Sequence, residues 1–276
     1  MDHRSSSKNV AAAVMLAALG YFVDIYDLIL FSIVRVPSLK DIGVPPESLL
    51  DTGLFLINMQ MGGMLLGGLL WGILADKKGR LSVLFGSIAM YSAANALNGF
   101  VHSVPAYAAL RFIAGIGLAG ELGAGITLVC ELMPKETRGY GTMVVAGVGI
   151  VGGVAAGLVG DWFGWRAAYF IGGGMGLALL ALRISVYESG LFDKVKNSAV
   201  KRGDFFMLFR GRERVLKYLN CILLGVPIWF VIGILATFAP EFGKALGIAD
   251  LPTGSRAVMW LYGGCALGDF ASGGLS

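Results

Sequence analysis

The sequence contains little charge. Only 14% of its 276 residues are Asp, Glu, Lys or Arg, whereas 56% are hydrophobic and the mean hydropathy is +0.74. Because soluble domains contain about 25% charged residues, this composition excludes a water-soluble globule and a disordered chain. No polar stretch is long enough to fold as a soluble catalytic domain, so we do not expect an enzyme. The composition predicts an integral membrane protein.

Cysteine patterns and a removable leader are also lacking. Cys130, Cys221 and Cys265 lie in apolar stretches, at spacings that match neither a disulfide framework nor a metal site. We therefore expect no metal and no cofactor. The first nine residues are polar, and the apolar run after them reaches about residue 34 without a small-residue cleavage site. This run is expected to stay in the protein as its first membrane span.

Eight apolar runs follow one another along the chain, each of roughly 20 to 26 residues, enough to cross about 30 Å of hydrocarbon as a helix. Backbone groups in lipid are satisfied only in helices or closed barrels, and these runs lack the alternation typical of barrel strands. The sequence therefore predicts an all-α integral membrane protein. The expected spans lie near residues 10–34, 51–75, 82–101, 105–130, 140–160, 164–186, 216–239 and 256–276.

The basic residues indicate the orientation of these spans. Lys and Arg exceed Asp and Glu by 22 to 18, but their placement in loops matters more than their sum, and we expect no nucleic-acid partner. With the N-terminus inside, the cytoplasmic loops contain Lys77, Lys78, Arg80, Lys135, Arg138 and all the basic residues from Lys194 to Lys217. The opposite loops contain little more than Arg35, Lys40 and Lys244. The positive-inside rule therefore predicts a cytoplasmic N-terminus.

One sizeable polar segment separates six spans from two. The expected parts are a cytoplasmic tail (1–9), an N-terminal six-helix bundle (10–186), a cytoplasmic linker (187–215) and the first two helices of a second, incomplete bundle (216–276). The sequence stops inside an apolar run, so we expect a truncated chain, and any functional statement refers to the full-length protein.

A glycine-containing charged loop joins the second and third spans. The thirteen residues from Gly72 read GILADKKGRLSVL. Gly72 allows close approach of a helix, and Asp76 lies where it can cap or pair at a helix end. Gly79 permits a tight turn, and Arg80 presents a bidentate fork. An ordinary basic loop would explain the cations but neither the glycines nor Asp76. The stretch resembles the loop signature G-x-L-A-D-x-x-G-R-x-x-x-L of the major facilitator superfamily.

Two further stretches carry the same resemblance. RFIAGIGLAGE, from Arg111 to Glu121, resembles the fourth-helix pattern R-x-x-x-G-x-G-x-x-G of that superfamily. ELMPKETRG contains Glu131 and Arg138 and resembles the E-x-x-P-x-x-x-R-G of sugar porters and metabolite symporters. After the sixth span, Glu188 matches the P-E-S-P-R of sugar porters only in part. The resemblance covers essentially the whole chain.

The resemblance implies the major facilitator fold, in which two six-helix bundles built from inverted repeats bind substrate between them. It implies a multi-pass protein of the plasma (inner) membrane. It also implies an inner charge network that locks one access state. The residues assigned to this inner gate are Gly72, Asp76, Gly79, Arg80, Glu131, Arg138 and Glu188.

The first span carries two acids three residues apart, Asp24 and Asp27, which share a helix face. GYFVDIYDL resembles the first helix of phosphate:proton symporters and, less closely, the D-G-x-D of aromatic-acid symporters, where Ile25 replaces the glycine. Carboxylates within a span are costly and functional by default. Hydration near the outer interface is the alternative, although Asp24 lies roughly 21 Å along the span. We expect a proton or substrate site, with Asp27, beside Tyr26, as the stronger candidate.

The fourth span carries Arg111 and, in its middle, Glu121, about 10 residues or roughly 15 Å apart along a straight helix. They cannot pair with each other, so each is expected to face the bundle interior. There they either take part in transport or help to assemble the bundle. The resemblance implies that Arg111 holds an anionic group of the substrate.

The leading hypothesis is a proton-coupled symporter for a small molecule: a sugar, an organic acid or phosphate. The fifth span has six glycines from Gly147 to Gly160 but lacks the Gly-Pro element of drug:proton antiporters, which favours symport. The expected partners are the substrate, the proton and the lipid bilayer. A uniporter is the alternative within transport, and a non-transporting sensor or an inactive truncated remnant is the alternative outside it.

Overall fold

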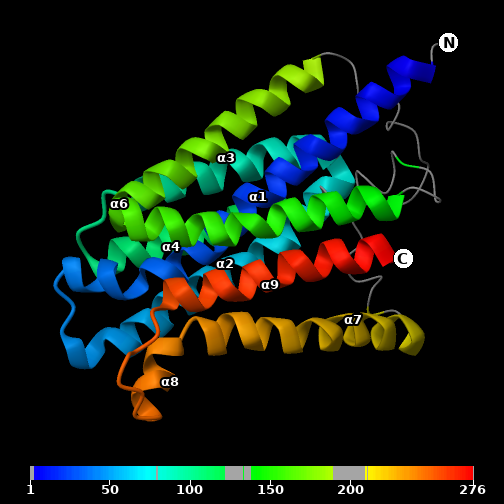
Figure 1. The fold of residues 1–276 in the computed structure, drawn as a ribbon. Helices are drawn as coiled ribbons and strands as arrows, with labels where there is room; N and C mark the ends of the chain where they lie inside the picture. Colours follow the sequence, from blue (N-terminus) through cyan, green and yellow to red (C-terminus); the bar gives the residue numbers. More distant parts are fainter. Residues whose placement is uncertain are drawn as a thin grey trace.

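The computed structural model describes residues 3–78, 80–121, 133, 138–188, 209 and 211–275, and over these residues the chain is helical without strands. Long helices lie side by side in a bundle, with the two chain ends toward the same end of it (Figure 1). The elements are α1 (His3–Asp41), the short helix η1 (Pro46–Ser48), α2 (Leu49–Lys78), α3 (Arg80–Asn98), α4 (Val104–Leu118), α6 (Arg138–Glu188), α7 (Arg212–Phe230), the π-helix η4 (Val231–Ala236), α8 (Ala239–Ala245) and α9 (Gly254–Leu275).

Helix α6 contains two spans joined by a sharp reversal at Gly164. This glycine has φ 78° and ψ 169°, a backbone conformation that glycine adopts without the steric cost of a Cβ. The two arms run back from this point, coloured green and yellow-green in Figure 1. The arms correspond to the fifth and sixth spans predicted from the sequence.

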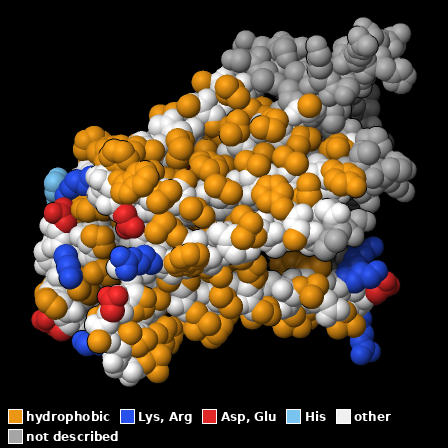
Figure 2. Space-filling view, in the orientation of Figure 1, with side chains coloured by type: hydrophobic (Ala, Val, Ile, Leu, Met, Phe, Trp, Pro, Cys, Tyr) orange, Lys and Arg blue, Asp and Glu red, His pale blue; other side chains and the backbone are white. Residues whose placement is uncertain are grey.

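The surface has the pattern of a chain that crosses a membrane several times. Four helical stretches are long and apolar enough to do so: Val14–Asp41, Pro46–Ala75, Gly139–Ile184 and Arg212–Ala236. Val104–Leu118 is a shorter apolar helix. In Figure 2, hydrophobic side chains cover the middle of the visible face and charged side chains gather at its two ends. An apolar band between polar ends is what a bilayer requires.

Two predicted spans, near 82–101 and 256–276, form helices α3 and α9 but are not among those four stretches. Both nevertheless belong to the bundle. Helix α3 packs against α4 and α6, and α9 packs against α6 and α1.

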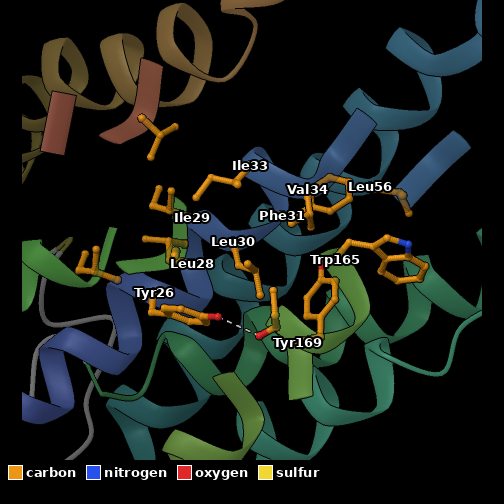
Figure 3. Packing of buried hydrophobic residues seen from close by; sticks show 14 of the residues in the cluster. Tyr26, Leu28, Ile29, Leu30, Phe31, Ile33, Val34, Leu56, Trp165 and Tyr169 are labelled. Atoms are coloured by element: carbon orange, nitrogen blue, oxygen red, sulfur yellow. Dashed lines mark hydrogen bonds between the residues drawn. The ribbon is translucent and has the colours of Figure 1, made fainter. Parts of the chain in front are cut away.

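Helix α1 forms the centre of the described bundle. Leu30 and Phe31 have no exposed surface, and Figure 3 shows them packed beside aromatic side chains from α6. The Tyr26 hydroxyl donates to the carbonyl of Ala168 in α6 at 2.9 Å. The acids predicted on α1 are therefore placed inside the bundle.

Helices α2 and α4 approach each other through glycines. A Cβ built on Gly63 or Gly67 of α2 would collide with the carbonyl oxygen of Phe112 or Ile116 of α4. Gly115 of α4 contacts the backbone of α2 in the same way. Small residues at such crossings let helix backbones pack closely in membranes. This contact positions the partners of Arg111 described below.

A methyl group at this crossing should force the helices apart. We expect Gly67→Ala to destabilise the protein by about 1–3 kcal/mol, as overpacking of a filled site does. Gly68→Ala is the matched control, because no described atom lies within 4 Å of its Cβ position, and it should change stability by less than about 0.5 kcal/mol. Thermal unfolding of the purified proteins in detergent measures the difference. Equal midpoints for both variants would contradict the close approach.

The fourth span differs from the prediction. Helix α4 ends at Leu118, and the next three residues form turns: Gly120 donates to the Gly117 carbonyl at 3.0 Å, and Glu121 donates to that of Leu118 at 3.4 Å. The expectation that Glu121 lies in the middle of a continuous helix is therefore wrong. Glycine in this stretch lowers helix propensity, and tightened bonds to the third preceding residue commonly end a helix. Residues 122–132 lie outside the described part of the chain.

Candidate substrate and proton site

Burial of charge identifies the candidate site. An ionised side chain inside a protein is costly unless it is paired, and within a membrane it is a functional candidate by default. The buried charged residues described by the structure are Asp24, Asp27, Arg35, Arg111, Glu121 and Arg183. Four of these are the proton and substrate candidates predicted from the sequence.

Arg111 is fully buried on α4 and has only neutral hydrogen-bond partners in the described structure. One terminal nitrogen donates to the side-chain oxygen of Gln60 on α2, and the other donates to the Tyr169 hydroxyl at 3.4 Å. Its guanidinium lies 4.8 Å from the ring centre of Phe31. The charge is therefore held in place without a directly bonded carboxylate.

Aromatic side chains surround this guanidinium. The Tyr107 and Tyr169 hydroxyls lie 2.7 Å apart, and Tyr107 also donates to the Ser38 hydroxyl at 3.4 Å. The rings of Tyr169 and Trp165 meet edge to face, with 6.3 Å between their centres. Figure 3 shows both of these side chains on α6, facing α1. The aromatic cluster gives Arg111 a largely apolar surrounding.

Asp27 is fully buried one turn along α1 from Asp24, and Gly172 of α6 leaves room for its carboxylate. Asn95 and Arg111 face it, but its oxygens make no well-formed hydrogen bond within the described part of the chain. Tyr169 is close enough to interact with both Asp27 and Arg111. A change in the charge next to Arg111 would therefore change how readily Asp27 binds or releases a proton.

The second group contains Asp24, Glu121 and Arg183. Glu121 forms a buried ion pair with Arg183 of α6 and accepts a hydrogen bond from the Tyr91 hydroxyl at 3.2 Å. Arg183 also donates to the Leu16 carbonyl at 3.4 Å. Asp24 faces Glu121 and Arg183, and its oxygens have no well-formed hydrogen bond to a described residue. Two acids therefore share one cation.

Sequence analysis missed Arg183 and Gln60. Arg183 lies inside the apolar run 164–186, and Gln60 lies inside the run 51–75. The rule that marks polar residues within membrane spans as functional candidates would have found both, but which charges they neutralise depends on tertiary packing.

Arg35 corrects a prediction. The basic-residue pattern placed it in an outer loop, but α1 continues past it to Asp41, and Arg35 is 1% exposed. It pairs with Glu241 of α8 at 2.6 Å and lies 4.6 Å from the ring centre of Phe238. These contacts join α1 to the segment that follows the predicted linker.

The inner-gate residues stay a prediction. Asp76 lies near the end of α2, Arg80 and Arg138 begin α3 and α6, and Glu188 ends α6, but the side chains of these four residues lie outside the described part. Gly79 and Glu131 lie outside it entirely. Gly72 is described, and no described atom lies within 4 Å of its Cβ position, so the close helix approach expected there is not seen.

Metal ligands are not grouped in this region. Among the residues with described positions, no three or more His, Cys, Asp or Glu side chains are placed to hold a metal ion. The chemistry of the site is therefore that of buried carboxylates, guanidinium groups, hydroxyls and amides.

Comparison with known proteins identifies relatives of this arrangement. The niacin transporter NiaP of Acinetobacter baylyi is 32% identical over 56% of this chain and 35% of its own length. The sialic acid transporter NanX of Escherichia coli is 28% identical over 84% of this chain and 57% of its own length. The inward-open xylose transporter XylE of E. coli superposes with a TM-score of 0.63 at 16% identity, covering 96% of this chain and 80% of that structure.

The chain spans about half the length of the curated relatives it matches. Its resemblance to XylE shows a shared fold, and the described helices match the transporter fold predicted from the loop and fourth-helix motifs. The sequence profile of the Major Facilitator Superfamily matches residues 11–276. The chain is therefore a multi-pass membrane protein that belongs to the Major Facilitator Superfamily, a family of transporters and not of enzymes.

Proposed function

We propose that the full-length chain is a secondary active transporter that carries a small organic carboxylate together with a proton, in the inner membrane with its N-terminus in the cytoplasm. One observation carries the proposal: Arg111 is fully buried, and its hydrogen bonds go to the neutral groups of Gln60 and Tyr169. A guanidinium binds carboxylate oxygens in a bidentate geometry. A substrate anion would supply the charge that Arg111 lacks as a direct partner.

The relatives support this substrate class. Niacin and sialic acid, named for two of them, are both carboxylic acids, although their remaining groups differ greatly. The shared carboxylate matches the buried guanidinium, and the aromatic cluster of Tyr107, Trp165 and Tyr169 offers apolar surface beside it. The rest of the substrate would therefore be recognised by contacts other than Arg111.

Proton coupling follows from competition for one cation. Among the described residues, Arg111 is the cation that faces Asp27. When a substrate carboxylate binds Arg111, the buried site gains a second negative charge, which is costly unless a proton neutralises it. Asp27 would take up that proton. Symport would then move one carboxylate with one proton, and each pH unit of gradient would supply about 1.4 kcal/mol, or roughly tenfold accumulation.

Alternating access requires closure at each end of the site. At the end predicted to face outside, the ion pair of Arg35 with Glu241 joins α1 of the first bundle to α8. At the opposite end, the predicted inner charge network would play the corresponding role. These two contacts would form in alternation as substrate passes.

Competition between matched acids and amides tests the substrate class. In vesicles containing the full-length protein, nicotinate and benzoate should inhibit uptake of radiolabelled nicotinate, whereas nicotinamide and benzamide should inhibit it roughly 100-fold less, because they lack the charge that Arg111 binds. Vesicles without the protein provide the background. Equal inhibition by the acid and its amide would contradict a carboxylate site.

A further inference from the structure

The cluster of Asp24, Glu121 and Arg183 contains one more acid than it has cations, and the proposed substrate site does not use it. We propose that Asp24 retains a proton whenever this cluster is buried as it is in the structure. This proton is distinct from the one exchanged at Asp27. The place of this proton in transport rests on the proposed function. Its presence does not, because it depends only on the chain's own side chains.

The geometry assigns the proton to Asp24. Arg183 forms its ion pair with Glu121, and Tyr91 donates a hydrogen bond to the same carboxylate. These two contacts stabilise Glu121 as an anion. Asp24 is 4% exposed and has no such donor among the described residues. An ionised carboxylate in that position would be both buried and unpaired, which is strongly unfavourable.

Among the described residues, no second cation faces Asp24. The groups that face it are Glu121 after α4, Arg183 of α6 and Asp27 of α1. The hydroxyls of Tyr21 on α1 and Tyr91 on α3 also lie within electrostatic reach. Arg183 is the one cation in this set, and it is already paired.

Glycine keeps the cluster compact. A Cβ on Gly20 of α1 would collide with both the Arg183 guanidinium and the Glu121 carboxylate. The ion pair therefore packs directly on the α1 backbone, one turn from Asp24. This contact leaves little room for the water that would stabilise an unprotonated Asp24.

The consequence is a pH requirement for closure that is separate from coupling. Arg111 is not part of this cluster, so we expect the proton on Asp24 to be needed for closure both with and without substrate at Arg111. Transport would then produce no net movement of this proton across the membrane. Closure should become unfavourable at alkaline pH, where Asp24 loses this proton.

The test compares thermal stability with pH for the purified full-length protein in detergent. A free aspartate ionises near pH 4, so the native state binds one more proton than the unfolded state above that pH. Stability contributed by this group must then fall as pH rises. Because Asp27 is a second buried acid on α1, the comparison is made in an Asp27→Asn background. There, Asp24→Asn and Glu121→Gln should each remove this decline: the first removes the acid, and the second leaves Asp24 free to pair with Arg183.

Three variants complete the design. Arg183→Gln should roughly double the slope of stability against pH, because Glu121 then needs a proton as well. Arg183→Lys should restore the parental slope. Asp27→Asn, outside the cluster, should retain the part of the decline that is due to Asp24. In this Asp27→Asn background, infrared spectra at neutral pH should show a protonated-carboxyl band, and adding Asp24→Asn or Glu121→Gln should remove it.

Two results would overturn the proposal: a pH slope that Asp24→Asn and Glu121→Gln both leave unchanged in the Asp27→Asn background, or a protonated-carboxyl band that persists there in both. Neither readout involves substrate. A failure of carboxylate competition would therefore count against the proposed function and leave this inference standing, and the reverse also holds.

Discussion

Arg111→Gln should reduce binding of a carboxylate substrate by roughly 100-fold. Glutamine can still bond to Gln60 and Tyr169, which hold Arg111 in the structure, so the packing is largely kept. The substrate anion would lose its charge-assisted hydrogen bonds, a loss of about 3 kcal/mol, and a factor of ten corresponds to about 1.4 kcal/mol. Uptake of labelled nicotinate at low concentration, in vesicles with equal amounts of each protein, measures the effect.

Arg111→Lys is the matched control for this prediction. Lysine keeps the positive charge but loses the planar fork of the guanidinium, so we expect an intermediate loss of roughly 10-fold. If Arg111→Gln transported carboxylates as well as the parent protein, the buried cation would serve only to assemble the bundle.

Asp27→Asn should abolish uphill uptake while preserving exchange of substrate across the membrane. Asparagine has nearly the same shape, and Gly172 leaves the same space for it, but it cannot gain or lose a proton. With the competing carboxylate removed, Arg111 should bind substrate at least as tightly. Exchange of substrate should lose the pH dependence that comes from Asp27 and keep the alkaline decline that comes from Asp24. Uptake driven by an imposed pH gradient, compared with exchange without one, separates the two activities.

Asp24→Asn provides the comparison within the same helix. It should keep both uphill uptake and exchange, because its proton is not the one that is coupled to substrate, and it should retain exchange to a more alkaline pH than the parent protein does. Uphill uptake by Asp27→Asn at the parental rate would exclude Asp27 as the coupling site. Parental uptake that survives a proton uncoupler would favour the uniporter instead.

The helical membrane fold and its family could be predicted from the sequence, because both depend on local patterns. Apolar runs determine the spans, and the stretch from Gly72 together with the one from Arg111 contains the family signatures. The buried acids on α1 were also predictable, since a carboxylate within a span is a rare and costly feature. The structure places Asp24 and Asp27 inside the bundle, as expected for such residues.

The pairing of charges was not predictable, because it depends on which helices meet. Arg183 is 62 residues from Glu121 in sequence, yet the two form a buried ion pair. Arg35 was assigned to an outer loop because the apolar run ends near residue 34, but the helix continues through Pro37 to Asp41. The end of α4 at Leu118 was missed because the apolar run continues past it in the sequence.

The most direct test of this mechanism is to count the protons taken up when a carboxylate binds. Nicotinate is added at a series of pH values to weakly buffered, purified full-length protein, and the change in pH is recorded against the amount bound. In the pH range where Asp27 is ionised before substrate binds, we expect the uptake of about one proton for each nicotinate bound by the parent protein and by Asp24→Asn, and none by Asp27→Asn, because Asp27 and the substrate compete for Arg111. Binding without proton uptake by the parent protein at any pH would contradict this mechanism.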